Sequence, residues 1–361
     1  DRRMTYTAVN AILSEADTKE KEEQKAGLLE EYKDFVAMFE RMKELSAILR
    51  EKRSKRGAID FDFPESKIIL DEKGKPVDIH PYERNVATKI IEDFMLLANE
   101  TVAKEYCERE IPFLYRVHET PDDDKMKKLV TFLQNFGYTM HMQGGQEIRP
   151  KEVQKLLDKI EGTPEEAMIS RLALRSMKQA RYSPDNDGHF GLATQYYTHF
   201  TSPIRRYPDL QIHRIIKDNL RGRMNDAKRH HYEKILPEVA METSSLERRA
   251  DEAERETLKL KKVQYMRNFF GQEFEGVISG ITKWGIYVEL PNTVEGLVHV
   301  TNMTDDHYDY DEEHYQMIGS HHRKTYKLGQ KVRVKMIDCD EISRTIDFRL
   351  VKERKEERED G

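Results

Sequence analysis

The chain has 361 residues, 35% of them charged and 37% hydrophobic, with a formal net charge of −6, and this length predicts two domains. No apolar run approaches the roughly 20 residues of a membrane helix and no apolar signal core begins the sequence, so we expect a cytoplasmic protein without a membrane partner. Cys107 and Cys339 lack a paired-ligand spacing, which argues against a disulfide framework and a cysteine zinc site.

The first half of the chain is predicted to be mostly helical. Apolar residues at helical spacing predict one long amphipathic helix from about residue 17 to 57, ending near Gly57. Two strand-like runs on either side of residues 71–75 predict a β-hairpin. Asp122, Asp123 and Asp124 are either a helix cap or a metal site, and acids at a helix start favour the cap. Further helices are expected at 85–109, 121–137, 150–160 and 164–181.

Positive charge gathers in residues 168–230, which hold 12 Lys and Arg against 5 Asp and Glu, a local charge of +7. A local excess of this kind suits a phosphate-binding groove, because charges beyond a Debye length are screened. Arg171, Arg175 and Lys178 recur at helical spacing and predict a basic stripe on one helix, the alternative being an ordinary solvated face.

The segment TSPIRRYPD predicts a helix that opens at Pro203 behind a Ser202 cap. Arg205 and Arg206 would then join the free N–H groups of the first turn in a phosphate site. Asp209 is spaced to orient Arg205. The alternative for the two arginines is a pair of salt bridges at an interface. Three nearby histidines could instead form a zinc site, but their spacing matches no local ligand pattern. Ser202 could act as a nucleophile, but no glycine elbow surrounds it. The three histidines are His189, His199 and His213.

The last third of the chain predicts a change from helix to strand. A charged helix is expected from Ser244 to Asn268, beginning with a capping pattern, and five short strands with glycines at the bends then suit a small barrel of the oligonucleotide-binding type. Alternation along GIYVEL predicts that Ile286, Val288 and Leu290 point inward and Tyr287 points outward. Trp284 and Tyr287 flank a bend beside Lys283 and His299, and an exposed pair of this kind is a platform for unpaired bases. The alternative is that both aromatics complete the barrel core.

Several of these motifs resemble one known family. LRSMKQARYS, GHFGL and YTHFTSPIRRYPDLQIHR resemble the signature of the ribonuclease II/ribonuclease R family, the RNB domain, and residues 271–350 resemble an S1 RNA-binding barrel. The domain order and the insertion YDYDEEHYQMIG resemble the ribonuclease R branch best. The resemblance implies an α+β fold with part of an RNB catalytic domain at 1–268, an S1 domain at 269–351 and a charged tail at 352–361.

The resemblance also implies a function, 3′-to-5′ degradation of single-stranded RNA to nucleoside 5′-monophosphates by metal-dependent hydrolysis. By position Arg205 resembles the family's catalytic arginine, Tyr6 and Glu92 resemble its contacts to the 3′ ribose, and Phe61 resembles half of its aromatic clamp. The remaining residues expected to bind RNA are Arg171, Arg175, Lys178, His199, Ser202, Arg206, Lys283, Trp284, Tyr287, His299, Asp340 and Arg344.

The metal is the point at which this sequence departs from the family. The family binds Mg²⁺ through aspartates in the early part of the RNB domain, so we expect these ligands upstream of this chain, no metal ligand within it, and little activity of the chain alone. The alternative functions are a single-stranded RNA-binding module without catalysis and a protein-interaction scaffold of long helices. The oligomeric state is left open.

Overall fold

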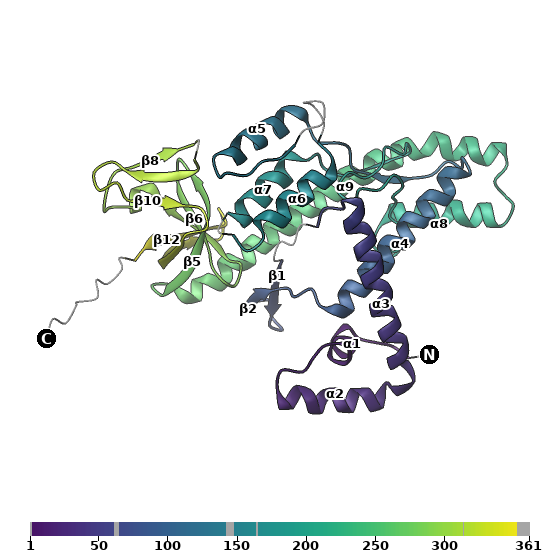
Figure 1. The fold of residues 1–361 in the computed structure, drawn as a ribbon, viewed down its shortest axis with the longest axis horizontal. Helices are drawn as coiled ribbons and strands as arrows, with labels where there is room; N and C mark the ends of the chain where they lie inside the picture. The colour runs from purple at the N-terminus through teal and green to yellow at the C-terminus, as the bar shows by residue number, and fades with distance from the viewer. Residues whose placement is uncertain (1, 61–64, 142–147, 164, 313, 352–361) are drawn as a thin grey trace.

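The computed structural model describes residues 2–60, 65–141, 148–163, 165–312 and 314–351. They form a mostly helical region followed by a β-barrel, and one long helix, α9 (Asp226–Met266), extends from the helical region to the barrel (Figure 1). The predicted α+β architecture is thereby confirmed. The charged tail falls outside the described residues. Within the described part of the chain, no helix combines the length and the apolar character needed to cross a membrane.

The long amphipathic helix predicted for residues 17–57 is two helices. α2 (Lys19–Glu31) and α3 (Lys33–Arg56) meet at Tyr32, whose φ of −108° and ψ of 18° take the backbone out of the helical conformation. The predicted end is correct, since Gly57 closes α3 with φ 100°, a left-handed conformation that glycine adopts without steric cost. The prediction of a single helix was wrong because side-chain periodicity continues through a one-residue break.

Two further helices pack with this pair and form a small apolar core. They are α1 (Tyr6–Leu13) and α4 (Val86–Glu108), and α4 begins with a capping box at Asn85, as its predicted start at residue 85 requires. In the chain, the predicted hairpin follows α3 and precedes α4, and it pairs β1 (Ser66–Leu70) with β2 (Pro76–Pro81). The core residues are Ile12, Leu13, Tyr32, Phe39 and Ile90.

A second core lies among three shorter helices. α5 (Asp123–Gln134) is capped by Asp122, whose Oδ1 accepts the N–H groups of Asp124 and Lys125 at 3.1 Å each, so the cap interpretation of the three aspartates is confirmed. α6 (Pro150–Ile160) begins with proline as predicted. α7 (Glu166–Ser176) ends five residues before the predicted Arg181, because the chain turns to an extended conformation at Met177.

Residues 188–214, the segment that holds TSPIRRYPD and the three histidines, are supported by two short strands and two helices. β3 (Tyr115–Val117) pairs with β4 (Arg181–Ser183), and α8 (Tyr207–Leu220) packs against α9. α9 was predicted to start at Ser244 but starts at Asp226 and continues through Pro237. Ser244 is therefore not a cap. Its buried hydroxyl donates to the Ala240 carbonyl and accepts the Tyr182 N–H, joining the helix to β4.

Five strands close into the predicted barrel, in the order β11-β12-β7-β6-β5. Gly285 makes the bend before β6 possible. Its φ is 142°, and a Cβ there would lie 2.1 Å from the Val298 carbonyl oxygen, so no other residue fits. The strands are β5 (Glu273–Thr282), β6 (Gly285–Glu289), β7 (Glu295–His299), β11 (Lys331–Asp340) and β12 (Thr345–Leu350).

The insertion between β7 and β11 forms a separate antiparallel sheet of three strands, in the order β10-β9-β8. Asp306 fastens it, because its carboxylate accepts three backbone N–H groups, from His307, His321 and His322. The strands are β8 (Tyr308–Asp311), β9 (Gln316–Gly319) and β10 (Thr325–Lys327), and 3₁₀ turns lie at Arg267–Phe269 and Val300–Asn302.

Candidate nucleic-acid interface

Residues 188–200 have an irregular backbone that lies along β3 and is held there by hydrogen bonds. The His118 N–H donates to the Gly188 carbonyl at 3.0 Å, and the Arg116 N–H donates to the Tyr197 carbonyl at 3.0 Å. The Thr198 hydroxyl donates to the Leu114 carbonyl at 2.6 Å. This half of the segment is therefore a rigid support for the turn and helix that follow it.

The predicted helix start at Pro203 is wrong. α8 begins at Tyr207, with Arg206 as its N-cap and Pro208 in its first turn. Ser202 caps nothing with its side chain; its carbonyl instead accepts the N–H groups of Arg205 at 3.3 Å and Arg206 at 3.0 Å. The sequence contains two proline start signals five residues apart, and the helix uses the second. Residues 202–206 therefore form a tight turn in front of the helix.

The two arginines of this turn have different environments. Arg205 is exposed, and its guanidinium has no hydrogen bond or ion pair to any other described residue. Arg206 is mostly buried, and its Nη2 lies 2.8 Å from Asp209 Oδ1. The predicted pairing of Asp209 with Arg205 is thus wrong. The turn directs the Arg206 side chain toward Asp209 and leaves the Arg205 side chain exposed. Arg205 is the guanidinium left free for a ligand.

The three histidines of the segment pack as aromatic rings. His189 and His199 each pack edge-to-face with Tyr197, with ring centroids at 5.1 and 5.8 Å, and His199 Nδ1 hydrogen-bonds the Tyr182 hydroxyl at 2.8 Å. His213 stacks on Phe200 at 4.5 Å and hydrogen-bonds its carbonyl at 2.9 Å. These contacts favour a structural role and bring no three histidines to one point.

Burial keeps two of these imidazoles neutral. Burial, with the nearby Arg206 and Arg116 guanidinium groups, lowers the pKa of His199 to about 2. Burial, with the neighbouring His118 and Arg116, lowers the pKa of His189 to about 3. Protonation of either ring at moderate pH would place a charge in a site that already holds two arginines.

We therefore expect the free energy of unfolding to fall as the pH drops below about 6.5. In the folded chain both rings stay neutral to about pH 3, whereas in the unfolded chain they take up protons at an ordinary pKa near 6.5. The unfolded state then binds more protons, and each histidine costs up to about 1.4 kcal/mol per pH unit. Urea unfolding at pH 7.5, 6.5 and 5.5 measures the slope.

The matched variant is His189→Asn, whose side-chain carbonyl can accept the Leu192 N–H that His189 Nδ1 accepts at 3.2 Å. This variant should show a shallower pH slope than the wild type, while the slope from the other buried histidines, His199 and His118, whose pKa values burial also lowers, should remain. A slope identical to that of the wild type would show that His189 is not among the groups that titrate on unfolding.

The predicted basic stripe on one helix is wrong. Lys178 lies beyond the end of α7 and pairs with Glu119 at 2.8 Å. Arg171 pairs with Glu289 at 2.6 Å and approaches Glu295 at 3.6 Å, which fastens α7 to the barrel. Arg175 is exposed and makes no ion pair with another described residue. RNA binding by these residues stays a prediction, for which Arg175 is best placed.

The residues predicted to contact the 3′ ribose lie on adjacent helices. Tyr6 is the first residue of α1 and about half exposed, and α1 is tied to the start of α4 by the Val86 N–H, which donates to Asn10 Oδ1 at 3.2 Å. Glu92 on α4 accepts both of its hydrogen bonds from Arg84 Nη2, at 2.9 Å each. Phe61 lies outside the described residues.

The barrel presents the predicted aromatic platform in part. Ile286, Val288 and Leu290 point inward and are buried, as the alternation predicts. Trp284 is 57% exposed with the Lys283 ammonium 4.9 Å from its ring centroid, so Trp284 is not part of the core. Tyr287 is half-buried, and His299 lies opposite Gly285 across β6 and β7. The side chains that could stack on bases therefore share one end of this strand pair.

Asp340 and Arg344, also predicted to bind RNA, are engaged within the chain. Asp340 accepts hydrogen bonds from the Ser343 hydroxyl at 2.7 Å and from the N–H groups of Ile342 and Ser343, which lowers its pKa and closes the turn between β11 and β12. Arg344 forms an ion pair with Glu256 of α9. Contact with RNA would require both to exchange or share these partners.

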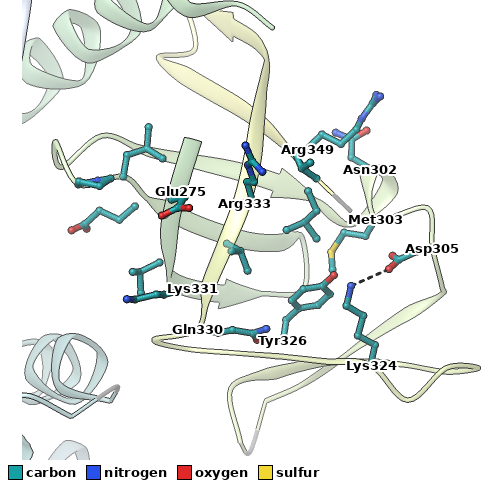
Figure 2. Close-up of a pocket in the computed structure, with 18 of the residues that line it drawn as sticks. Glu275, Asn302, Met303, Asp305, Lys324, Tyr326, Gln330, Lys331, Arg333 and Arg349 are labelled. Carbon is teal, nitrogen blue, oxygen red and sulfur yellow. Dashed lines mark hydrogen bonds and ion pairs between the residues drawn. The ribbon is translucent and has the colours of Figure 1, made fainter. Parts of the chain in front are cut away.

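A hollow of about 1270 Å³ lies on the barrel, between β5, β11 and the inserted sheet (Figure 2). It is lined neither by Arg205 nor by Trp284, Tyr287 and His299. Its cations and acids nearly balance, and Lys324 already lies 3.4 Å from Asp305, so size alone does not make it the candidate site. The charged lining residues are Lys324, Lys331, Arg333, Arg349, Glu275, Glu289 and Asp305.

The described residues do not form a magnesium site. Nowhere among them do three or more His, Cys, Asp or Glu side chains come together as ligands would. Mg²⁺ requires oxygen ligands in near-octahedral arrangement.

Two supporting arginines were missed by sequence reasoning. Arg84 grips Glu92, and Arg116 lies over the Tyr182 ring at 4.7 Å while pairing with Glu247 at 2.6 Å. Both pairs join residues that periodicity cannot relate, Arg116 and Glu247 being 131 positions apart. Arg84 and Arg116 both lie outside the elements predicted from the sequence, so no pattern marked them.

Comparison with known proteins gives two family matches. The model of the RNB domain matches residues 1–222, and that of the S1 RNA binding domain matches residues 268–350. Ribonuclease R 1 of Lactococcus lactis is 43% identical over 96% of this chain and 41% of its own length. Ribonuclease R of Aquifex aeolicus is 43% identical over 97% of this chain and 48% of its own. The chain thus spans about half the length of the relatives it matches.

Solved structures agree in fold. The apo form of Mycoplasma genitalium RNase R has a TM-score of 0.81 at 28% identity, covering 96% of this chain and 53% of that one. The same protein in complex with ribose methylated single-stranded RNA has a TM-score of 0.80 at 28% identity. The similarity extends over nearly all of this chain and half of its neighbour.

Proposed function

Because this chain belongs to the RNB family and carries an S1 domain, we propose that the protein is a processive 3′-to-5′ exoribonuclease of single-stranded RNA. The family resemblance predicted from the motifs is confirmed by relatives named ribonuclease R at 36–43% identity. The observation that carries the proposal is the free Arg205 guanidinium on a turn that buried contacts hold in place.

Arg205 would contact the phosphate at which the chain is cut. In the hydrolysis a water oxygen bonds to phosphorus, the bond from phosphorus to the 3′ oxygen breaks, and that oxygen leaves with a proton. The product is a nucleoside 5′-monophosphate and an RNA shorter by one unit. Negative charge builds up on the phosphoryl oxygens, and a fixed guanidinium lowers the barrier most when it needs no rearrangement to meet that charge.

The substrate path follows from the other candidates. Trp284, Tyr287 and Lys283 would hold unpaired bases and the backbone at the barrel, and Arg175 would add a phosphate contact. Tyr6 and Glu92 would contact the 3′ ribose. The metal is proposed to be Mg²⁺, held by ligands outside the described residues, and the location is proposed to be the cytoplasm. Single-stranded RNA is the proposed partner.

Glu92→Ala should weaken discrimination between RNA and a strand ending in a 3′ deoxyribose. A carboxylate that accepts from the 2′ hydroxyl has no partner when that hydroxyl is missing, so its removal should erase about 1 to 3 kcal/mol of selectivity. Competition between the two substrates measures this, with Glu100→Ala on the same helix as control. Unchanged discrimination would remove Glu92 from the ribose site.

The test of the function uses the intact protein with Mg²⁺ and RNA labelled at either end. Exonucleolytic attack from the 3′ end predicts a ladder from 5′-labelled RNA and immediate release of labelled mononucleotide from 3′-labelled RNA. Binding of RNA without shortening would favour the non-catalytic module instead. Internal cuts in a single turnover would contradict an exonuclease.

A further inference from the structure

We propose that Asp209 is the positioning residue for Arg205, because its buried carboxylate fixes the turn that presents the Arg205 guanidinium to the substrate phosphate. The proposal rests on the proposed function, since it concerns how Arg205 is held during cleavage. Asp209 touches no substrate in this proposal and acts through the turn alone.

One carboxylate oxygen holds both ends of the turn. Asp209 is 0% exposed, and its Oδ1 accepts the Ser202 N–H at 2.7 Å and Arg206 Nη2 at 2.8 Å. Ser202 opens the turn and Arg206 closes it, while Ile204 and Arg205 stand exposed at its tip. Loss of either donor from Oδ1 would therefore free one end of the turn.

Asp209 is itself well fixed. It lies in the first turn of α8, where the helix dipole favours a negative charge. α8 is anchored by Ile212 and Ile215, both fully buried, and His213 holds the chain ahead of the turn through the Phe200 carbonyl. Because α8 and the chain before the turn are both anchored, the Asp209 carboxylate has a fixed position from which it can hold the turn.

The charges around Asp209 separate the roles of the two arginines. The carboxylate neutralises Arg206 inside the molecule, so that this guanidinium serves the turn. Arg205 has no partner within the described chain and keeps its full charge for a phosphate. Asp209 Oδ2 and Arg206 Nε are buried without a hydrogen-bond partner among the described residues, so the carboxylate is held through Oδ1 alone and loss of either donor to Oδ1 is costly.

The experiment is a double-mutant cycle in the intact protein, following single-turnover shortening of 5′-labelled RNA with Mg²⁺ together with RNA affinity. Asp209→Asn keeps the volume and an acceptor for Ser202 but loses the ion pair to Arg206. It should slow cleavage on the order of 30-fold, since misplacement by about 1 Å costs up to about 100-fold, and leave affinity within about twofold. In an Arg205→Ala background the same change should have no further effect on the rate.

The matched control is Asp218→Asn on the same helix. Asp218 Oδ2 accepts the Tyr232 hydroxyl at 2.8 Å and pairs with Lys228 at 3.0 Å, so its loss weakens the contact of α8 with α9 without touching the turn. Asp218→Asn should lower stability but leave the cleavage rate within about twofold.

Should Asp209→Asn not fold, Arg206→Met enters the same cycle, because methionine keeps an unbranched side chain but cannot donate to Asp209 Oδ1 and so removes the closing contact of the turn.

Three results would overturn the proposal. An equal slowing by Asp209→Asn with and without Arg205 would mean that Asp209 acts independently of Arg205, and an equal slowing by Asp218→Asn would mean a general loss of structure. A normal rate in Asp209→Asn, with Arg205→Ala slow, would reject the positioning role and leave the proposed function standing. A normal rate in Arg205→Ala would reject both.

Discussion

Replacing Arg205 with alanine is expected to slow cleavage of single-stranded RNA by about 1000-fold while RNA affinity changes by less than about threefold. The guanidinium is exposed and unengaged by other described residues, so its removal costs the folded state little. Its contribution arises as charge develops on the phosphate, which makes the loss appear in the rate of the chemical step. Single-turnover shortening at saturating protein, with affinity from a separate titration, measures the two quantities.

The matched control for Arg205 is Arg221→Ala, an exposed arginine at the end of α8. It removes the same charge from the same helix at the opposite end, and its rate should stay within about twofold of wild type. If Arg205→Ala cleaves at the wild-type rate, or if both variants lose activity to the same degree, the catalytic assignment of Arg205 fails.

Replacing Trp284 and Tyr287 together with alanine should weaken binding of single-stranded RNA by about 30-fold or more. Each base stacked on an aromatic ring contributes about 1 to 3 kcal/mol, so two stacks contribute at least about 2 kcal/mol. The cleavage rate of RNA that is already bound should not change, because the platform lies on the barrel and Arg205 on the turn before α8. Filter binding and single-turnover cleavage separate these effects.

The control for the platform is Phe270→Ala, a 70% exposed aromatic on the connection into the barrel and not on β6. It should leave RNA affinity within about twofold. Unchanged affinity in the Trp284/Tyr287 variant would mean that bases do not stack there. A loss of barrel stability in that variant alone would return Tyr287, which is half-buried, to the barrel core.

Local patterns predicted much of the fold because they report local physics. Alternation along residues 286–290 correctly placed Ile286, Val288 and Leu290 inside the barrel. Gly57 correctly located the end of α3, and the Asp122 cap correctly located the start of α5. The start of α8 was misplaced because Pro203 and Pro208 carry the same local signal, and the helix begins at the second of them.

Charge patterns predicted the site less well, since partners distant in sequence decide which charges are free. The barrel glutamates that engage Arg171 lie 118 and more positions away, and Arg344 is engaged by a residue 88 positions before it. Spacing could place Arg205 and Arg206 together, but it could not tell that Asp209 would bind the second and leave the first exposed.

The decisive measurement is a titration of 5′-labelled single-stranded RNA with this 361-residue chain and, in parallel, with the intact protein, in Mg²⁺, scoring binding and shortening together with DNA as a control. We predict that both bind RNA in preference to DNA and that the intact protein alone produces a ladder from the 3′ end. A 3′ ladder produced by the chain itself would show that metal ligands lie within its 361 residues and would contradict the expectation that they lie upstream of it. An intact protein that binds RNA without shortening it would contradict the exoribonuclease.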